Sequence, residues 1–419
     1  MEEFLGLTDR RKAVLVIMDG LGDRPLKELN GQTTLQAART PVFDRLAKTG
    51  QNGLMDVIGP GITPGSDAAH LALFGYNPKV YYKGRGPLET LGSGLDSAPG
   101  DIAFRTNFAT VDSNLVVTDR RAGREFTHEE QKALQEQIDG IEIDGVTVRF
   151  LATVEHRGAL VLRGKGLSDK ITDVDPHETG KHIAECKALS PDANETAKVV
   201  NKLVIEVYNR LKDLKVNKER EKRGLPPANI ILLRGAGRHE EIPSLQEIFK
   251  IKAAVIAGGA LYIGTGKYVG MEHVPAEGQT GTITTNFHNI AMKAVDCINS
   301  DYDYVFVHIK ATDNASHDGN YKEKILAIEK TDEMVGEIVD AVGDKIVIVI
   351  TGDHSTPIME KEHACDPVPI ILWANFMRQD SVDKFSEIDA GHGALNTIRG
   401  LDVMPMLLGY AGYIEKFGA

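Results

Sequence analysis

Three hydrophobic segments of this sequence each lead to an aspartate, at Asp19, Asp313 and Asp353. Two of these acids have a histidine close by, because His317 follows Asp313 by four residues and His354 follows Asp353 directly. Parallel α/β sheets bind ligands at the carboxyl ends of their strands, so we expect these side chains to meet at one edge of a sheet. Mixed carboxylate and imidazole ligands suit Mn²⁺, Zn²⁺, Co²⁺ or Mg²⁺. The pattern therefore predicts a metal centre.

A sixth ligand candidate, His363, follows in the segment EHACDPVPIIL. Six protein ligands are more than one catalytic ion normally takes while it keeps an open position. The set therefore predicts two divalent ions. A pair of ions can clamp the attacking and leaving oxygens of an in-line displacement at phosphorus.

Such a centre needs a nucleophile, and Ser66 in the segment TPGSDAAH is the candidate. The segment has the pattern of a helix start, where a phosphorylated serine would be stabilised. A nearby metal ion would lower the pKa of the hydroxyl and activate it. The plainer alternative is that Ser66 only caps the helix, and the two roles are compatible.

The acids also have plainer explanations when each is taken singly. Asp19 and Asp353 could be turn residues after strands, and Asp313 with His317 could be a surface pair on a helix. The coincidence of three strand-end acids with suitable neighbours favours the metal centre over three independent turns.

The composition is that of a soluble globular protein. The chain has 419 residues, of which 42% are hydrophobic and 26% are charged, and its net charge is −12. An acidic chain argues against a nucleic-acid partner, which usually requires a basic face. The three cysteines, Cys186, Cys297 and Cys365, indicate reduced thiols. The short apolar run before Asp19 argues against a signal peptide or a membrane span, so we expect a cytoplasmic protein.

Strand and helix patterns alternate at both ends of the chain, and the middle has a different texture of short strands and a charged segment. We expect an α/β domain with a mostly parallel sheet, built from residues 1–100 together with 240–419. A smaller α+β domain is expected as an insertion at residues 101–239. Residues 215–227 are strongly charged and are expected to form a solvated surface turn.

Taken together, the motifs resemble the cofactor-independent (2,3-bisphosphoglycerate-independent) phosphoglycerate mutases of the alkaline phosphatase superfamily, in their archaeal-type branch. The resemblance covers nearly the whole chain and rests on long matches: VLVIMDGLGDRP, TPGSDAAHLALFGYNP, GRGPLETLGSGL, GLSDKITDVDPH, HIKATDNASHDGN, TGDHSTP, DPVPIIL and IRGLDVMPMLL. It implies an alkaline-phosphatase-like sheet with helices on both faces, and an inserted domain that binds substrate.

The resemblance also assigns the ligands. It implies one ion held by Asp19, Ser66, Asp353 and His354, and a second ion held by Asp313, His317 and His363. The gap between Asp353 and His363 is shorter than in the bacterial branch, so His392 in AGHGALN is kept as a backup ligand. A surface-loop histidine is the plainer role for His392.

A phosphoglycerate carries a phosphate and a carboxylate, and arginine forks match both groups. Without the family, the arginines of TDRRAGR could equally be a solvated turn. The resemblance makes seven residues substrate contacts: Arg105, Arg120, Arg121, Arg124, His156, Arg157 and Lys267. Lys267 could instead be a surface lysine. Asp173 in TDVDPH is the candidate acid/base for the glycerate hydroxyls, with a turn cap as the plainer alternative.

The expected function is the isomerisation of 3-phosphoglycerate and 2-phosphoglycerate in glycolysis and gluconeogenesis, through a phosphoserine and without 2,3-bisphosphoglycerate. Two divalent ions are expected, Mn²⁺ first, with no organic cofactor and a small-molecule substrate as the partner. The oligomeric state is left open. The rivals are a phosphatase or phosphonate hydrolase with the same site, another phosphoryl-transfer enzyme of the superfamily, and a non-catalytic metal-binding protein.

Overall fold

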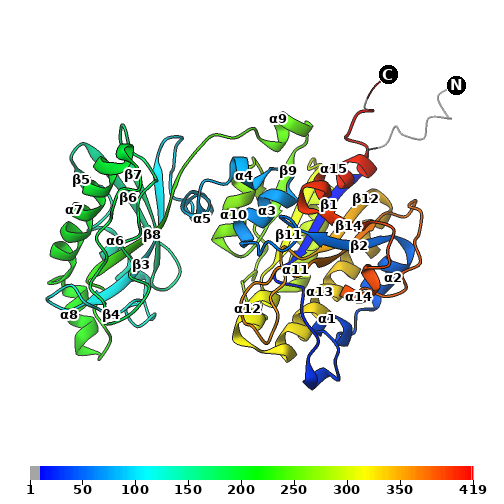
Figure 1. Cartoon of the computed structure of the whole chain (residues 1–419), viewed down its shortest axis with the longest axis horizontal. Helices are drawn as coiled ribbons and strands as arrows, with labels where there is room; N and C mark the ends of the chain where they lie inside the picture. The colour runs from blue at the N-terminus through cyan, green and yellow to red at the C-terminus, as the bar shows by residue number, and fades with distance from the viewer. Residues whose placement is uncertain (1–9, 417, 419) are drawn as a thin grey trace. The chain divides into compact units, whose positions relative to one another are not determined.

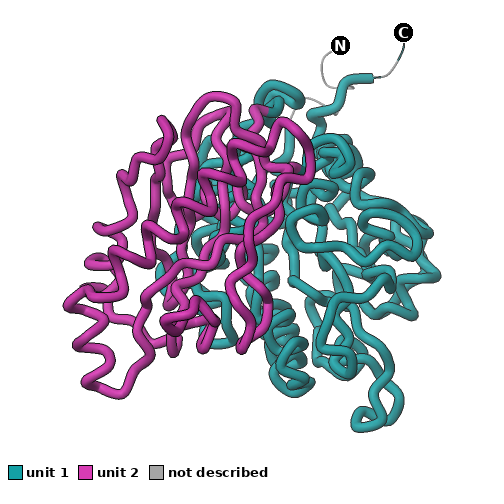
Figure 2. The backbone as a smooth tube through the Cα atoms, turned by 60° about the vertical axis from the view of Figure 1, so that its left-hand side comes forward, with its two compact units in different colours: residues 1–82, 242–419 teal, residues 83–241 magenta. Residues whose placement is uncertain are grey.

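The computed structural model describes residues 10–416 and 418, which divide into two compact units. Unit 1 takes in the described residues up to Tyr82 and those from Ile242 onward, and unit 2 is Lys83–Glu241. Figure 2 distinguishes the two units by colour. Unit 2 is therefore an insertion into the chain of unit 1.

Unit 1 is built around an eight-stranded sheet in which only β13 runs antiparallel to its neighbours. In sheet order the strands are β10 (Glu272–His273), β9 (Ala253–Ile256), β11 (Tyr304–Ile309), β1 (Lys12–Met18), β12 (Ile346–Thr351), β13 (Val368–Trp373), β2 (Gln51–Asp56) and β14 (Asn396–Arg399). The expected α/β class with a mostly parallel sheet is confirmed.

The central strands β11, β1 and β12 are almost entirely buried, which explains why each is an unbroken hydrophobic run. Alternate residues of β1 point to opposite faces of the sheet. Val14, Val16 and Met18 join one core with residues of α2, α11 and α13. The other face is covered by α3, α10 and α15 (Figure 1).

The helices of unit 1 alternate with these strands along the chain. Their bounds are α1 (Thr34–Ala37), α2 (Pro41–Thr49), α3 (Ser66–Leu73), α4 (Pro78–Tyr81), α9 (Leu245–Phe249), α10 (Ala260–Tyr268), α11 (Phe287–Ile298), α12 (Ala311–Asp318), α13 (Tyr321–Val342), α14 (Glu387–Ala390) and α15 (Gly400–Ala411).

Unit 2 is an antiparallel sheet with helices. Its strand β3 (Ile102–Val111) lies between β7 (Arg157–Arg163) and β8 (Ile230–Arg238), and the remaining strands are β4 (Val117–Asp119), β5 (Glu142–Ile143) and β6 (Val146–Ala152). The helices are α5 (Arg85–Ser93), α6 (His128–Gln135), α7 (Asn194–Leu211) and α8 (Lys215–Lys222). One continuous core joins these strands to α7.

Unit 2 begins at Lys83, earlier than the expected boundary at residue 101, because α5 packs on β3 and β8. Gly86 permits this packing, since a Cβ atom at this position would collide with the backbone carbonyl of Ala103. The packing of a helix against a strand does not change the local pattern of hydrophobic residues. The sequence therefore does not show that residues 83–100 belong with unit 2.

The expected surface turn at residues 215–227 is wrong, because most of it forms α8. Arg220 of this helix is fully buried and donates hydrogen bonds to the carbonyl oxygens of Pro226, Glu125 and Ala122 and to the carboxylate of Glu130. The charged segment predicts a solvated turn because most of the acceptors of Arg220 lie far from it in the chain, so the sequence does not show that they are near.

No helix among the described residues is long and apolar enough to cross a membrane.

Arg220→Met should lower the free energy of unfolding of unit 2 by about 3–5 kcal/mol, because it leaves Glu130 and three carbonyl groups without their buried partner. Urea denaturation followed by circular dichroism measures this loss. Arg223→Met is the matched control, since Arg223 pairs with the same Glu130 but has a half-exposed side chain. It should cost less than about 1 kcal/mol. Equal losses in the two variants would contradict this account of α8.

Candidate metal centre

The three strand-end aspartates lie at one edge of the sheet of unit 1. Asp19 directly follows β1, Asp313 lies in the first turn of α12 after β11, and Asp353 follows β12 by two residues. Because β11, β1 and β12 are neighbouring parallel strands, their carboxyl ends converge. Gly20 supports this convergence: it has a φ of +63°, and a Cβ atom there would lie 2.7 Å from Asp313 Oδ1.

The first group of possible ligands is Asp19, Asp353 and His354, whose ligand atoms lie within 4.8 Å of one another. His354 Nε2 is 3.2 Å from Asp19 Oδ1, 3.3 Å from Asp353 Oδ2 and 3.1 Å from Ser66 Oγ. All four side chains are buried. Burial together with the charge of Asp19 raises the pKa of Asp353 to about 7, and a positive charge beside the carboxyl group would lower it again.

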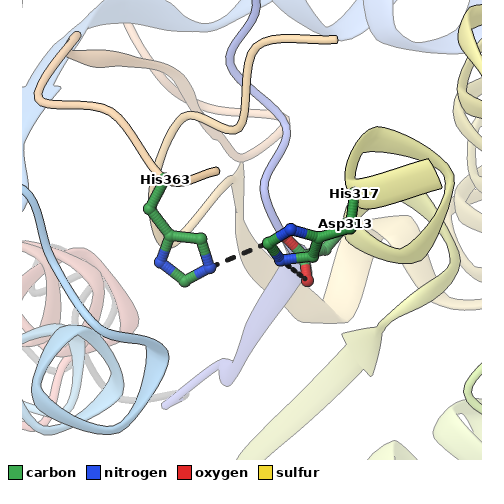
Figure 3. Close-up of side chains that lie close together, drawn as sticks. All are labelled: Asp313, His317 and His363. Atoms are coloured by element: carbon green, nitrogen blue, oxygen red, sulfur yellow. Dashed lines mark ion pairs between the residues drawn. The ribbon is translucent and has the colours of Figure 1, made fainter. Parts of the chain in front are cut away.

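The second group is Asp313, His317 and His363, again within 4.8 Å (Figure 3). His317 Nε2 is 3.3 Å from Asp313 Oδ2, and His363 Nε2 is 3.8 Å from Asp313 Oδ1. The ring of His363 stacks on that of His354 with centroids 3.6 Å apart, so the two groups are adjacent.

The histidines present the ring nitrogens that a metal would need. His317 Nδ1 lies 2.7 Å from the carbonyl oxygen of Lys361, and His363 Nδ1 lies 2.9 Å from that of Pro64. A carbonyl oxygen only accepts, so Nδ1 of each ring carries a proton and Nε2 is the nitrogen that faces Asp313. Metal-ligating histidines are commonly oriented in this way.

The carboxylates also fit a metal. Within the described part of the chain, both oxygens of Asp19 and Oδ2 of Asp353 are buried and accept no well-formed hydrogen bond. The nearest nitrogens to the Asp19 oxygens, those of Lys310, His308 and His354, make only ion-pair contacts at 3.1–3.2 Å. A buried carboxylate without a donor is costly unless a cation compensates it. The donor set therefore fits one divalent ion in each group.

Ser66 is the first residue of α3, and Gly65 occupies the N-cap position without a side-chain cap. The plain capping role is therefore wrong for Ser66, whose hydroxyl faces His354 instead. The positive end of the α3 backbone lies at this hydroxyl, which favours an anion there.

The sequence did not point to three residues that contact the candidate ligands or Ser66, namely His308, His70 and Lys310. His308 Nε2 lies 3.2 Å from Asp19 Oδ2, and its ring stacks on Tyr262 at 3.5 Å between centroids. His70 Nδ1 lies 2.6 Å from the carbonyl oxygen of Ser66. Lys310 Nζ is 3.1 Å from Asp19 Oδ2 and also contacts Asp313. The available signals were a histidine inside the hydrophobic run YVFVHI and a lysine three residues before Asp313.

The expected arginines of unit 2 fall into distinct environments. The positive charges of Arg157, Arg124 and Arg234 surround the buried His156 and, after burial itself, lower its pKa to about 4. Burial lowers the pKa of Arg105 to about 10, and the charges of Arg85, Arg234 and Arg157 act in the same direction, whereas Glu89 opposes them. These residues form a cationic cluster, in which Arg234 and Arg85 were not foreseen.

Two of the predicted arginines do not share that environment. Arg120 donates from Nε at 3.0 Å and from Nη2 at 2.7 Å to the carboxylate of the buried Asp175, and Arg121 is exposed. Asp173 accepts the backbone N–H of Gly235 at 2.9 Å and has His177 Nε2 at 3.3 Å from its second oxygen.

The two remaining candidates lie in unit 1. Lys267 is exposed in the last turn of α10, and its charge acts on His273, whose pKa is lowered by burial and then by this lysine. His392 is exposed just after α14 and belongs to neither ligand group.

His363→Ala should weaken the binding of one of two Mn²⁺ ions by at least about tenfold, since loss of even an orienting group typically costs that much. Equilibrium dialysis with metal analysis measures the stoichiometry. His392→Ala is the control and should bind both ions as the unmodified protein does. A loss in His392→Ala with none in His363→Ala would exchange the roles of the two residues.

The family model for 2,3-bisphosphoglycerate-independent phosphoglycerate mutase matches residues 47–217. Phosphoglycerate mutase 1 of this type from Methanocaldococcus jannaschii is 50% identical, covering 97% of this chain and 99% of that protein. A solved protein from Pyrococcus horikoshii has a TM-score of 0.86 at 38% identity, covering 98% of this chain and all of the other. The cofactor-independent mutase from Thermoplasma acidophilum has a TM-score of 0.72 at 38% identity, with 96% and 100% covered.

The similarity extends over both units and almost the whole length of the relatives, and it confirms the expected resemblance. The chain, with its paired ligand groups and its inserted antiparallel unit, belongs to the archaeal-type 2,3-bisphosphoglycerate-independent phosphoglycerate mutases, a family of isomerases.

Proposed function

We propose that this protein interconverts 3-phosphoglycerate and 2-phosphoglycerate, a step of glycolysis and gluconeogenesis, by passing the phosphoryl group through Ser66. The observation that carries the proposal is the buried contact between Ser66 Oγ and His354 Nε2 at 3.1 Å. His354 belongs to the first candidate ligand group, and the chain belongs to this family. No 2,3-bisphosphoglycerate is required, because the serine itself stores the phosphoryl group.

Two divalent ions, Mn²⁺ before Mg²⁺, Co²⁺ or Zn²⁺, complete the centre in this proposal. Asp19, Ser66, Asp353 and His354 would hold one ion, and Asp313, His317 and His363 the other. When bound, the ions lower the pKa of the serine hydroxyl and neutralise the charge that develops on the phosphoryl oxygens.

In the first step, Ser66 Oγ, which has already lost its hydroxyl proton, attacks phosphorus, and the bond between phosphorus and the 3-oxygen of the glycerate breaks. The electron pair of that bond goes to the 3-oxygen, which takes a proton. In the second step, the 2-oxygen loses its proton and attacks the phosphoserine, and the electron pair of the broken bond returns to Ser66 Oγ. The positive end of α3 stabilises the phosphoserine between the two steps.

The glycerate must stay bound while it reorients, or the phosphoserine would be lost to water. The cationic cluster of unit 2 supports this part of the proposal, because Arg105, Arg157 and Arg234 can hold a carboxylate by paired hydrogen bonds. Arg124 and His156 belong to the same cluster. We assign the proton transfers at the 3- and 2-oxygens to Asp173, whose oxygen Oδ1 is fixed by the N–H of Gly235.

The remaining expected contacts have different roles in the proposal. Arg120 positions Asp175 rather than the substrate, because its guanidinium is already engaged. Arg121 and Lys267 are both exposed. They remain proposed contacts for the negatively charged groups of the substrate.

Ser66→Ala should lower kcat for the conversion of 3-phosphoglycerate by at least about 10³-fold, because the phosphoryl acceptor is removed. A coupled assay for 2-phosphoglycerate, with Mn²⁺ present and 2,3-bisphosphoglycerate absent, measures the rate. Ser300→Ala at the end of α11 is the control and should retain full activity. Full activity in Ser66→Ala would refute the phosphoserine mechanism.

A crossover experiment tests whether the glycerate stays bound. The substrate is a mixture of 3-phosphoglycerate labelled with ¹³C in the glycerate and 3-phosphoglycerate labelled with ¹⁸O in the phosphate. Mass spectrometry of the 2-phosphoglycerate should show the two labels in separate molecules, because each phosphoryl group returns to its own glycerate. Scrambled labels would show that the glycerate exchanges, and free phosphate as the main product would make the protein a phosphatase.

Asp173→Asn should lower kcat by about 10²–10⁴-fold, since general acid–base catalysis contributes an effect of that size. Asp169→Asn is the matched control, because Asp169 also accepts one backbone N–H, from Arg238. The dependence of kcat/KM on pH is recorded for each variant. A loss of activity in Asp173→Asn with an unaltered pH profile would make Asp173 a positioning residue and would contradict its proposed acid–base role.

A further inference from the structure

Lys310 is the cation closest to the candidate metal centre. It lies between the end of β11 and the start of α12, with a side chain that is only 23% exposed. Its Nζ is 3.1 Å from Asp19 Oδ2 and makes an ion pair with Asp313 Oδ2. The ring of Tyr262 lies on another side, 5.6 Å from Nζ to the ring centroid.

The two carboxylates that Lys310 contacts belong to different ligand groups. Asp19 is in the group with Asp353 and His354, and Asp313 is in the group with His317 and His363. The lysine ammonium therefore contacts carboxylates that both divalent ions would use. It joins the two groups through Asp19 Oδ2, which His308 Nε2 also approaches at 3.2 Å, and Asp313 Oδ2, which His317 Nε2 approaches at 3.3 Å.

The charge balance of the centre gives this contact its importance. Asp19, Asp313 and Asp353 are three buried carboxyl groups, of which Asp19 and Asp353 share one candidate ligand group and Asp313 belongs to the other. The other buried lysine near these loops, Lys324, bonds to the carbonyl oxygens of Gly22 and Thr356 and lies 3.6 Å from Asp23. Within the described residues, its hydrogen bonds and its ion pair involve none of the three aspartates, and the charge of Asp313 acts on it only at longer range.

We propose that Lys310 is an internal counter-cation: it holds Asp19 and Asp313 in position before metal binds, and it competes with the divalent ions for their oxygens. The inference rests on the two-ion centre proposed above, but not on the identity of the substrate. It makes Lys310 a positioning residue that sets how much divalent metal the protein requires.

The sign of each effect follows from electrostatics. Removing one positive charge beside the carboxylates increases their attraction for a divalent ion. The same removal leaves the carboxylates repelling one another in the metal-free protein. Loss of Lys310 should therefore lower the stability of the metal-free protein and raise its affinity for metal. If Lys310 had a merely structural role, its loss would lower both.

The test uses Lys310→Met, with Lys322→Met on the exposed side of α13 as a charge-matched control. Each protein is stripped with a chelator, its melting temperature is measured by calorimetry, and Mn²⁺ binding is followed by electron paramagnetic resonance of the free ion. For Lys310→Met, the melting temperature of the stripped protein should fall by about 2–8 °C. Its Kd for Mn²⁺ should fall by at least about tenfold, and the control should change in neither respect.

Lys310→Arg keeps the charge and guards against a folding failure in the methionine variant. It should resemble the unmodified protein in both measurements, with a Kd for Mn²⁺ changed by less than about threefold. Unchanged or weaker Mn²⁺ binding in Lys310→Met would overturn the inference. So would a gain in Mn²⁺ affinity in Lys310→Arg as large as that in Lys310→Met. If the unmodified protein bound no Mn²⁺, the proposed function would fail first. If the unmodified protein bound two ions but the two Lys310 variants did not show the changes expected above, the inference alone would fail.

Discussion

The structure of unit 1 depends on one costly arrangement, which is the burial of three carboxylates side by side at the end of a parallel sheet. Asp19, Asp313 and Asp353 are each no more than 1% exposed. Removing a carboxylate from water is unfavourable unless a cation or hydrogen-bond donors compensate it. The neighbouring positions of β11, β1 and β12 impose this closeness, because the strands are parallel and end together. Compensation by positive charge is therefore a requirement of the fold, and the chemistry uses the same charges.

The surroundings of the aspartates show how the chain meets that requirement. Backbone carbonyl groups accept the Nδ1 protons of His317 and His363, which turns Nε2 of each ring toward Asp313. Lys324 donates to the carbonyl oxygens of Gly22 and Thr356 and so connects the loop after β1 to the loop after β12. The candidate ligands Asp19, Asp353 and His354 thus lie in loops whose backbone is held by hydrogen bonds, and Asp313 and His317 lie in α12. Such fixed positions are what a precise metal geometry needs.

Unit 2 solves the opposite problem, since it brings cations together in an acidic protein. Burial and neighbouring charges lower the pKa of Arg105 to about 10 and that of His156 to about 4. An arrangement of like charges is unfavourable by itself, and it is relieved when an anion binds. The partly buried Arg120 and the fully buried Arg220 show the alternative, because each is already paired with a carboxylate, that of Asp175 and Glu130 respectively. Arg105 and Arg234 also have acidic neighbours, at 3.2 Å from Glu89 and 4.0 Å from Asp175, so a substrate anion would share them with these carboxylates.

The sequence by itself determined the local parts of this protein. Each central strand is a continuous hydrophobic run that ends near an aspartate, so the α/β class and the six ligand candidates could be read without coordinates. The long motifs were sufficient to identify the family. What only the tertiary structure decided are contacts between residues far apart in the chain. Lys310 contacts Asp19, and Arg220 is buried against acceptors that include Ala122 and Glu125. Ser66 faces His354 rather than the backbone of its own helix. The reason is physical: hydrophobic periodicity reports which face of an element is buried, whereas the partner of a buried polar group is set by strand order and packing.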